Sequence, residues 1–218
     1  MESRKRKAVD VSKTGTSLAG ETQAKKLPKK ESSVKIFYSK SKDQKDLEGY
    51  DNSDWRRRLS NFSPRTLTIR GRCYPSAEHA FQAAKAKCST IPKLSKQFEV
   101  GGKINEQPGS AKKAGGKGSY KKAGVELDVV KWNRERDHAM EAIVRARFDE
   151  DEDFRKILQI VSRNGAYLLH FERSGAKSYW GGSVAKDTGR VQGNNALGEL
   201  MMRVEREHRS ASKTDLSP

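Results

Sequence analysis

The 218-residue sequence has two cysteines and no long apolar run, and each of these shortages excludes a class of protein. No stretch reaches the roughly 18 apolar residues of a transmembrane helix, and the N-terminus lacks the apolar core of a secretory signal. Cys73 and Cys88 form neither a CxxC pair nor a disulfide framework. We therefore expect a soluble intracellular protein, with no membrane partner and with both thiols reduced.

Sequence motifs for metals and nucleotides are missing as well. The four histidines show no HExxH or similar ligand spacing, and the chain has neither a GxxxxGK[ST] loop nor a GxSxG elbow. We expect no metal and no other cofactor. The sequence therefore indicates neither a P-loop nucleotidase nor a serine hydrolase.

Basic charge, by contrast, is abundant. The formal net charge is +17, and only 33% of the residues are hydrophobic. Residues 1–33 hold nine Lys and Arg against four acids, a balance of +5 that leaves +12 for the remainder. With no aromatic side chain to bury, this segment predicts a disordered basic arm. The basic remainder favours a polyanionic substrate.

Three roles fit the basic arm of residues 1–33. Clusters of Lys and Arg are typical of nuclear-import signals and of loose contacts with nucleic-acid phosphates, and they also occur in tails that only improve solubility. We expect a nuclear location if the source is eukaryotic and a cytoplasmic one otherwise.

The pattern of apolar residues predicts an α+β fold, mostly helical, as a single domain with a small β-sheet over residues 34–208. A flexible C-terminal tail over 209–218 would follow. We expect strands at 34–38 and 166–172, a loop over 39–58, a hairpin over 66–74 with its turn at Gly71, and helices near 128–148, 153–163 and 194–208. Asp153 and Asn194 are the expected helix caps.

The alanine-rich stretch that follows Pro75 contains the most informative pattern. Pro75 suits the first turn of a helix, and Ser76 can accept hydrogen bonds from the free N–H groups there. At about 100° per residue, Glu78, Gln82 and Lys85 share one face. The apolar positions Ala77, Phe81, Ala84 and Cys88 repeat along another face. Taken alone, a face with Glu and Lys two turns apart is usually just the solvated face of an amphipathic helix.

Five motifs in order give the chain a resemblance to the NADAR family, over roughly residues 34–208. The family pattern runs LSNF, YPSxEHxFQxxKA, WxxxRDxxM, WG and GxNxLGxxLM. The matching segments start at Leu59, Tyr74, Trp132, Trp180 and Gly193. Composition alone would make residues 101–124 a flexible linker, but residues 108–115 match a PxxAKxxG segment of the family, so we expect a short helix there inside the domain.

The resemblance implies an N-glycoside hydrolase. Some similar proteins act on phosphorylated intermediates of riboflavin synthesis, and others remove ADP-ribose from the amino group of guanine in nucleic acids. Both reactions break a carbon–nitrogen bond at an anomeric carbon, and an oxocarbenium-like state of this kind requires a nearby carboxylate. Glu78 is the candidate for that role, and Asp187 is a candidate second carboxylate. Lys85 would bind a phosphate or, with its pKa lowered by burial, attack the anomeric carbon.

The remaining candidates would bind the substrate. Aromatic rings stack on bases or flank sugars, amides bind hydroxyls, and glycine allows a phosphate to approach the backbone. These candidates are Asn61, Phe62, Tyr74, Gln82, Trp132, Trp180, Gly181 and Asn195. Core packing is the alternative for the aromatic residues, above all for Trp132.

Two departures from the family pattern bear on the substrate. Lys177 stands where many members have an Asp shortly before the WG motif, and residues 158–162 replace an LLxT segment. We expect them to alter substrate choice and not to abolish activity, because the motif around Glu78 is intact.

Three functions stay open from the sequence. The preferred one is removal of ADP-ribose from guanine in DNA or RNA, so that the partner is an ADP-ribosylated nucleic acid. The alternatives are a glycosidase of riboflavin-pathway intermediates and a non-catalytic module that binds nucleic acid or an ADP-ribose-like small molecule. The basic arm favours a nucleic-acid substrate. Attack by water and attack through a lysine imine both remain, and nothing in the sequence indicates an oligomeric state.

Overall fold

The computed structural model describes residues 33–104 and 106–214, so the predicted basic arm lies outside the described residues, apart from Ser33. In this part the chain is an α+β fold, mostly helical, as predicted. The elements are β1 (Val34–Phe37), α1 (Trp55–Arg58), β2 (Leu67–Ile69), β3 (Arg72–Tyr74), α2 (Ala77–Ala86), the 3-10 helix η1 (Pro92–Phe98), α3 (Pro108–Ala114), α4 (Lys117–Lys122), α5 (Val129–Glu150), α6 (Glu152–Arg163), β4 (Tyr167–His170), the 3-10 helix η2 (Gly175–Lys177), β5 (Ser183–Val184), β6 (Val191–Gln192) and α7 (Ala196–Thr214).

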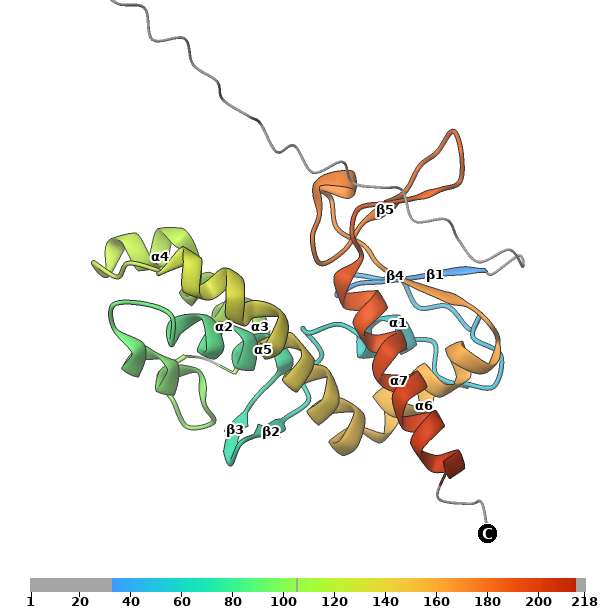
Figure 1. Ribbon diagram of the computed structural model, residues 1–218, viewed down its shortest axis with the longest axis horizontal. Coiled ribbons are helices and arrows are strands. Elements are labelled where there is room, and N and C mark those ends of the chain that lie inside the picture. Colours follow the sequence, from blue (N-terminus) through green and yellow to red (C-terminus); the bar gives the residue numbers. More distant parts are fainter. Residues whose placement is uncertain (1–32, 105, 215–218) are drawn as a thin grey trace, which may run out of the picture.

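The long helix α5 runs through the middle of the molecule and divides it (Figure 1). On one side lie α2, α3, α4 and the β2–β3 hairpin. On the other side lie β1, β4, α1, α6 and α7, and the β5 segment stands above them. Helix α5 contacts α2, α6 and α7, so it joins the two sides.

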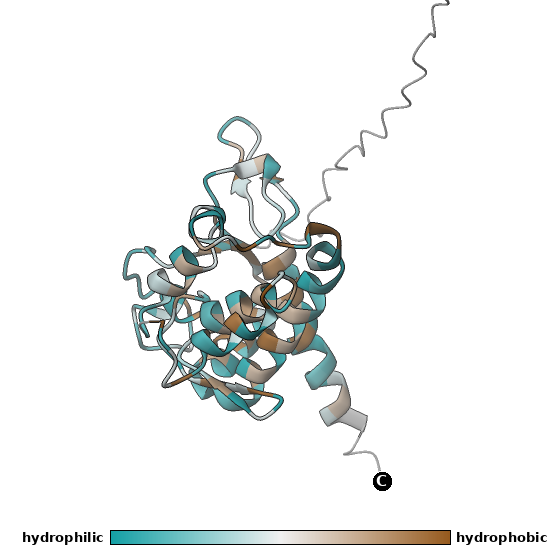
Figure 2. Cartoon of the chain, turned by 90° about the vertical axis from the view of Figure 1, so that its left-hand side faces the viewer, coloured by the Kyte–Doolittle hydropathy of each residue, from teal (hydrophilic) through white to brown (hydrophobic). Residues whose placement is uncertain are grey.

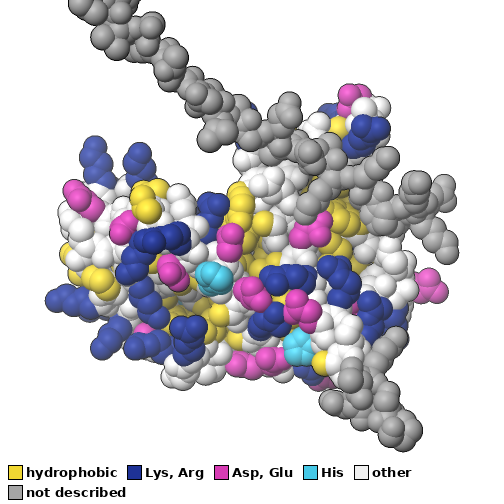
Figure 3. Space-filling model, in the orientation of Figure 1, with side chains coloured by type: hydrophobic (Ala, Val, Ile, Leu, Met, Phe, Trp, Pro, Cys, Tyr) yellow, Lys and Arg dark blue, Asp and Glu magenta, His cyan; other side chains and the backbone are white. Residues whose placement is uncertain are grey.

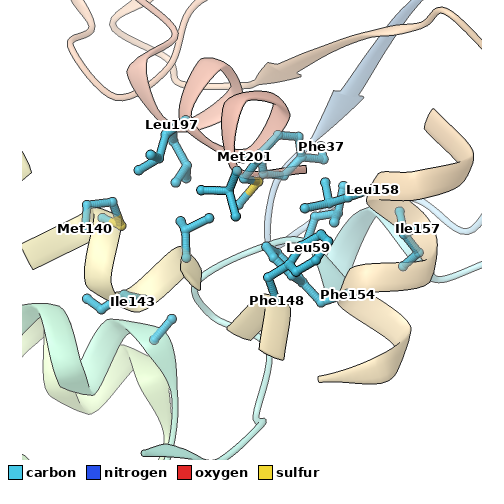
Figure 4. Packing of buried hydrophobic residues seen from close by; sticks show 14 of the residues in the cluster. Phe37, Leu59, Met140, Ile143, Phe148, Phe154, Ile157, Leu158, Leu197 and Met201 are labelled. Carbon is cyan, nitrogen blue, oxygen red and sulfur yellow. The ribbon is translucent and has the colours of Figure 1, made fainter. Parts of the chain in front are cut away.

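The core fills the space between α5, α6, α7, α1 and the β1 strand (Figure 4). On α6, Phe154, Ile157, Leu158 and Val161 are each at most 2% exposed, which confirms the apolar face predicted for this helix. In a view at right angles to Figure 1, brown apolar segments gather between the helices while teal segments lie along their outer sides (Figure 2). Each fully buried large apolar side chain contributes about 1.5–3 kcal/mol to folding.

The strands form three separate two-stranded sheets within the described residues, where we expected one small sheet. Strands β1 and β4 pair in parallel, with Val34 opposite Tyr167. The β2–β3 hairpin is antiparallel as predicted, and its turn uses Arg70 and Gly71 at φ 50° and 73°. Two consecutive positive φ angles are typical of tight hairpin turns, because they match the twist of the strands. The β5–β6 pair was not predicted, since two residues per strand give no alternation to detect.

Several predicted boundaries were wrong. The predicted loop over 39–58 was expected to end near Trp55, and the helical turn α1 does begin there, with Trp55 fully buried. Pro75 precedes α2 instead of occupying its first turn, whereas Ser76 is the N-cap as predicted. The short helix predicted within 108–115 is confirmed as α3, and α4 follows it.

Both predicted caps of the later helices were displaced. Asp151, not Asp153, caps α6 by accepting a hydrogen bond from the Phe154 N–H at 3.1 Å. Helix α7 starts at Ala196, so Asn194 is not adjacent to it. The helix also continues past its predicted end at 208 to Thr214, since no Gly or Pro interrupts residues 199–214.

Among the described residues, no helix combines the length and apolar composition needed to cross a bilayer.

Candidate active site on helix α2

The start of helix α2 is held rigidly, and this positions Glu78. The Ser76 hydroxyl accepts a hydrogen bond from the His79 N–H at 3.4 Å and lies 2.8 Å from His79 Nδ1, with both side chains fully buried. The Glu78 N–H donates to the Asn61 carbonyl at 3.0 Å. The LSNF turn is thereby fixed against the first turn of α2. Asn61, a predicted site residue that is distant in sequence from Glu78, is thus brought to it, and Phe62 is the next residue in the chain.

The three polar side chains predicted on one face of α2 do lie together. Glu78 and Gln82 are each 7% exposed, and Gln82 Nε2 donates to Glu78 Oε1 at 2.9 Å. Lys85 is partly buried, and its Nζ donates to the Gly115 carbonyl at 2.8 Å and lies 5.6 Å from the centre of the Tyr120 ring. This face of the helix is therefore a buried polar cluster and not a solvated surface.

A glycine makes room for this cluster. A Cβ atom on Gly115 would lie 2.0 Å from Gln82 Oε1, although the backbone angle φ of −81° is ordinary. Close approach, and not backbone conformation, is what excludes a side chain here. The glycine of the PxxAKxxG segment thus borders the Glu78 cluster, which its spacing did not indicate.

Burial moves the pKa values of the two charged groups toward each other. Loss of water raises the pKa of Glu78, opposed by the Gln82 hydrogen bond and by the charges of Lys112 and Lys85. Loss of water also lowers the pKa of Lys85, as predicted, and the charge of Glu78 opposes this shift. Opposed shifts of this kind are typical of acid, base and nucleophile groups in active sites.

Sequence reasoning missed Lys112, a charged neighbour of the cluster, and His170, which interacts electrostatically with Lys112. Lys112 on α3 has its Nζ 5.5 Å from the centre of the Phe62 ring. Its charge lowers the pKa values of both Glu78 and His170, so it lies within electrostatic reach of both. The PxxAKxxG match already contained Lys112, and that was the available signal. His170, at the end of β4, belonged to no motif.

Three buried polar atoms in this region have no hydrogen-bond partner among the described residues: Asn61 Oδ1, Gln82 Oε1 and His170 Nδ1. Burial lowers the pKa of His170, which favours the neutral ring. Buried polar atoms in native proteins are nearly always paired, so the two open acceptors that lie near Glu78, on Asn61 and Gln82, are candidates for contact with a ligand.

A group of aromatic rings packs on Phe81 of α2. Phe81 packs edge-on against Trp132 and Trp180, with ring centres 5.1 and 5.7 Å apart. Trp132 is only 9% exposed, which fits the core-packing alternative, whereas Trp180 is partly exposed. Tyr179 packs on Trp180 at 5.0 Å and carries the Arg136 guanidinium 3.9 Å above its ring. Phe81, expected only in the core, links the WG motif to the Glu78 helix.

Asn195 and Gly181 are engaged by the protein itself. The Asn195 amide donates to the Leu168 carbonyl at 2.7 Å and to the Tyr167 hydroxyl, and its oxygen accepts the His170 N–H at 2.9 Å. A Cβ on Gly181 would lie 2.4 Å from the His170 carbonyl. These residues hold the end of β4, and neither side chain position is open to a ligand.

Two further candidates lie away from Glu78. Tyr74 is 4% exposed on β3 and faces a hollow on the other side of α2. Asp187 is exposed in the turn between β5 and β6, which stands clear of α2 (Figure 1). The structure does not bring either side chain to the Glu78 cluster.

Metal ligation has no candidate in residues 33–104 and 106–214, where no group of three His, Cys, Asp or Glu side chains could hold an ion.

Comparison with known proteins gives a consistent picture. A family model described as the NADAR domain matches residues 36–209. The protein named N-glycosidase YbiA of Shigella flexneri serotype 5b (strain 8401) is 26% identical over 155 residues, which is 71% of this chain and 83% of that protein, and the YbiA of Shigella flexneri matches equally. The NMR structure of E. coli YbiA has a TM-score of 0.58 at 23% identity and covers 86% of this chain and 90% of that one, which shows a shared fold.

Proposed function

Because the chain belongs to the NADAR domain family, we propose that it is an N-glycosidase that removes ADP-ribose from guanine bases in DNA or RNA. The relatives named N-glycosidase YbiA support hydrolysis of a carbon–nitrogen glycosidic bond. The observation that carries the proposal is the buried cluster in which Gln82, Lys85 and Lys112 surround Glu78. The name of these relatives does not specify a substrate, and we propose guanine-linked ADP-ribose as the substrate of this chain.

In the proposed reaction, water adds to the anomeric carbon, the carbon–nitrogen bond breaks, and the departing amino group of the base takes up a proton. Positive charge develops on the sugar, and the Glu78 carboxylate offsets it and accepts the proton of the attacking water. Because burial raises the Glu78 pKa, this carboxylate accepts a proton more readily than an exposed one, and it can pass that proton to the departing amino group.

Lys85 supports a second route for the same bond cleavage. Its amine attacks the anomeric carbon, the base departs, and ring opening leaves an imine that water then hydrolyses. This route requires a neutral amine, and burial lowers the Lys85 pKa in that direction. Its hydrogen bond to the Gly115 carbonyl would have to break before attack.

The open polar atoms around Glu78 match the substrate's chemistry. Asn61 Oδ1 and Gln82 Oε1 are acceptors, and ribose hydroxyls and guanine N–H groups are donors. Phe62 and Trp180 are partly exposed rings suited to stacking on a base, and Lys112 is an exposed cation suited to the pyrophosphate. The net charge of +17 favours a polymeric nucleic acid over a small sugar phosphate.

The test is release of free ADP-ribose from a guanine-ADP-ribosylated oligonucleotide. The wild type and Glu48→Gln should release it, because Glu48 is exposed and outside the cluster, whereas Glu78→Gln should not. Binding of the oligonucleotide should survive Glu78→Gln. No release from a folded wild type that binds the oligonucleotide would indicate a non-catalytic reader. Turnover of small riboflavin-pathway glycosides alone would indicate the other glycosidase function.

Borohydride distinguishes the two routes. Reduction during turnover traps an imine as a stable amine on Lys85, which mass spectrometry detects as an added ADP-ribose. Turnover without any such adduct would support direct attack by water.

A further inference from the structure

We propose that a hollow on the opposite side of helix α2 from Glu78 is a second ligand site, which binds a nucleoside phosphate. The hollow lies between α2, α5 and the β2–β3 hairpin and has a volume of about 310 Å³. This volume falls at the lower end of the range for small-molecule sites. It is a separate site, because Ala80 and Ala84 line it and these residues lie roughly 200–240° around the helix from Glu78.

The rim of the hollow is basic. Arg70 and Arg72 come from the hairpin, Lys87 from the end of α2 and Lys131 from the first turn of α5, and Glu135 is the acid among the lining residues. Arg72 is bonded to Glu99 at 2.5 Å. Three cations without a described ion-pair partner therefore remain against one acid, which favours an anionic ligand.

Many of the remaining lining residues are apolar, and we take them as the floor of the hollow. This floor is formed by short side chains of α2 and α5 together with one aromatic ring: Ala80, Ala84, Ala139, Ala142, Ile143 and Tyr74. A base placed on this floor would have its phosphate at the basic rim, which is how nucleic-acid binding proteins combine stacking with phosphate contacts. Inorganic phosphate alone would leave this floor unused.

The charge of this hollow distinguishes it from its neighbours. The hollows between α5 and α7, and between Pro64 and Asp153, are both lined by more acidic than basic side chains. In Figure 3, Lys and Arg side chains gather over α4, the first half of α5 and the hairpin, on the part of the surface that includes this site. The ligand is either a free nucleotide or one nucleotide of a polynucleotide, since both present a base and a phosphate.

The test compares binding of adenosine 5′-monophosphate, adenosine and a short unmodified oligonucleotide. The double variant Arg70→Asn, Lys131→Gln removes two exposed cations, and Asn tolerates the positive φ angle of residue 70. The control Lys42→Gln, Lys156→Gln removes the same charge elsewhere. In the double variant the affinity for adenosine 5′-monophosphate should fall about tenfold or more, and the log–log salt slope of oligonucleotide binding should decrease by about two. The control should leave both nearly unchanged.

A filling variant separates the pocket from general surface charge. Ala139→Leu extends a floor residue without changing the charge, and it should weaken nucleotide binding while α5 remains folded by circular dichroism. Competition of the mononucleotide with the oligonucleotide would indicate a polynucleotide subsite, and mononucleotide binding alone would indicate a free nucleotide. Equal losses in the double variant and the control, unchanged binding in Ala139→Leu, or equal binding of adenosine would each overturn the proposal. Binding does not depend on hydrolysis, so Glu78→Gln should retain it and the two proposals fail separately.

Discussion

Substitution of Gly115 by alanine should disturb the site through one side chain, Gln82. The new Cβ would lie 2.0 Å from Gln82 Oε1 and 2.7 Å from its Cδ, and contacts closer than 3.0 Å are essentially never seen. The amide must therefore swing away by about 1 Å or more, which breaks its 2.9 Å hydrogen bond to Glu78. The backbone at residue 115 itself accepts alanine without strain, since its φ is −81°.

The expected cost follows from two terms. Loss of a hydrogen bond to a charged group destabilises the folded state by about 1.5–3 kcal/mol. Replacing glycine by alanine stabilises it by about 0.4–1 kcal/mol, because alanine restricts the unfolded chain. Gly115→Ala should thus lower the free energy of unfolding by about 1–2 kcal/mol at a pH where Glu78 is ionised. Urea unfolding at matched m-values measures this change.

A double-mutant cycle with Gln82→Ala identifies the cause. In the Gln82→Ala background the clash no longer exists, so Gly115→Ala should be neutral or slightly stabilising. The same loss of stability in both backgrounds would refute the reasoning. A second readout is the pH dependence of activity. The Gln82 hydrogen bond lowers the Glu78 pKa, so its loss in Gly115→Ala should move the acidic limb of the rate profile to higher pH.

Three further outcomes are expected. Burial raises the Glu78 pKa above its ordinary value of 4.5, so the stability that Glu78 contributes is complete below pH 4.5 and is lost as the pH rises through the raised pKa. Glu78→Gln should therefore raise Tm near pH 8 but not near pH 4. An equal change in Tm at both pH values would contradict this linkage. Arg147 is buried, its pKa is lowered to about 10, and it donates hydrogen bonds to the backbone carbonyls of residues 58–60. Arg147→Met should therefore lower the free energy of unfolding in urea by about 3–5 kcal/mol. A loss below about 1 kcal/mol would show that these hydrogen bonds are dispensable. Gly181→Ala should cost about 1–3 kcal/mol by thermal unfolding, since its Cβ would lie 2.4 Å from the His170 carbonyl, and unchanged stability would argue against that tight packing.

Local patterns in the sequence determined most of the elements. The hairpin over 66–74, the Ser76 cap and the apolar face of α6 each depend on residues within a few positions of one another, and all three are present. The shared face of Glu78, Gln82 and Lys85 follows from helix geometry in the same way. Boundaries failed where a distant contact decided them, as at Asp153, which accepts hydrogen bonds from Tyr50 and Arg58 and does not cap α6.

The surroundings of Glu78 were decided by the tertiary structure. Helical spacing placed Glu78 and Gln82 together, but whether that face meets water or protein depends on residues 61 and 115, which lie far from it in the chain. Packing of these segments buries the carboxylate and shifts its pKa. The same packing turns Asn195 toward β4 and leaves Asn61 with an open acceptor. A sequence pattern indicates which side chains share a helix or strand. The dielectric environment of a side chain and its hydrogen-bond partners depend on which other elements pack within a few ångströms of it.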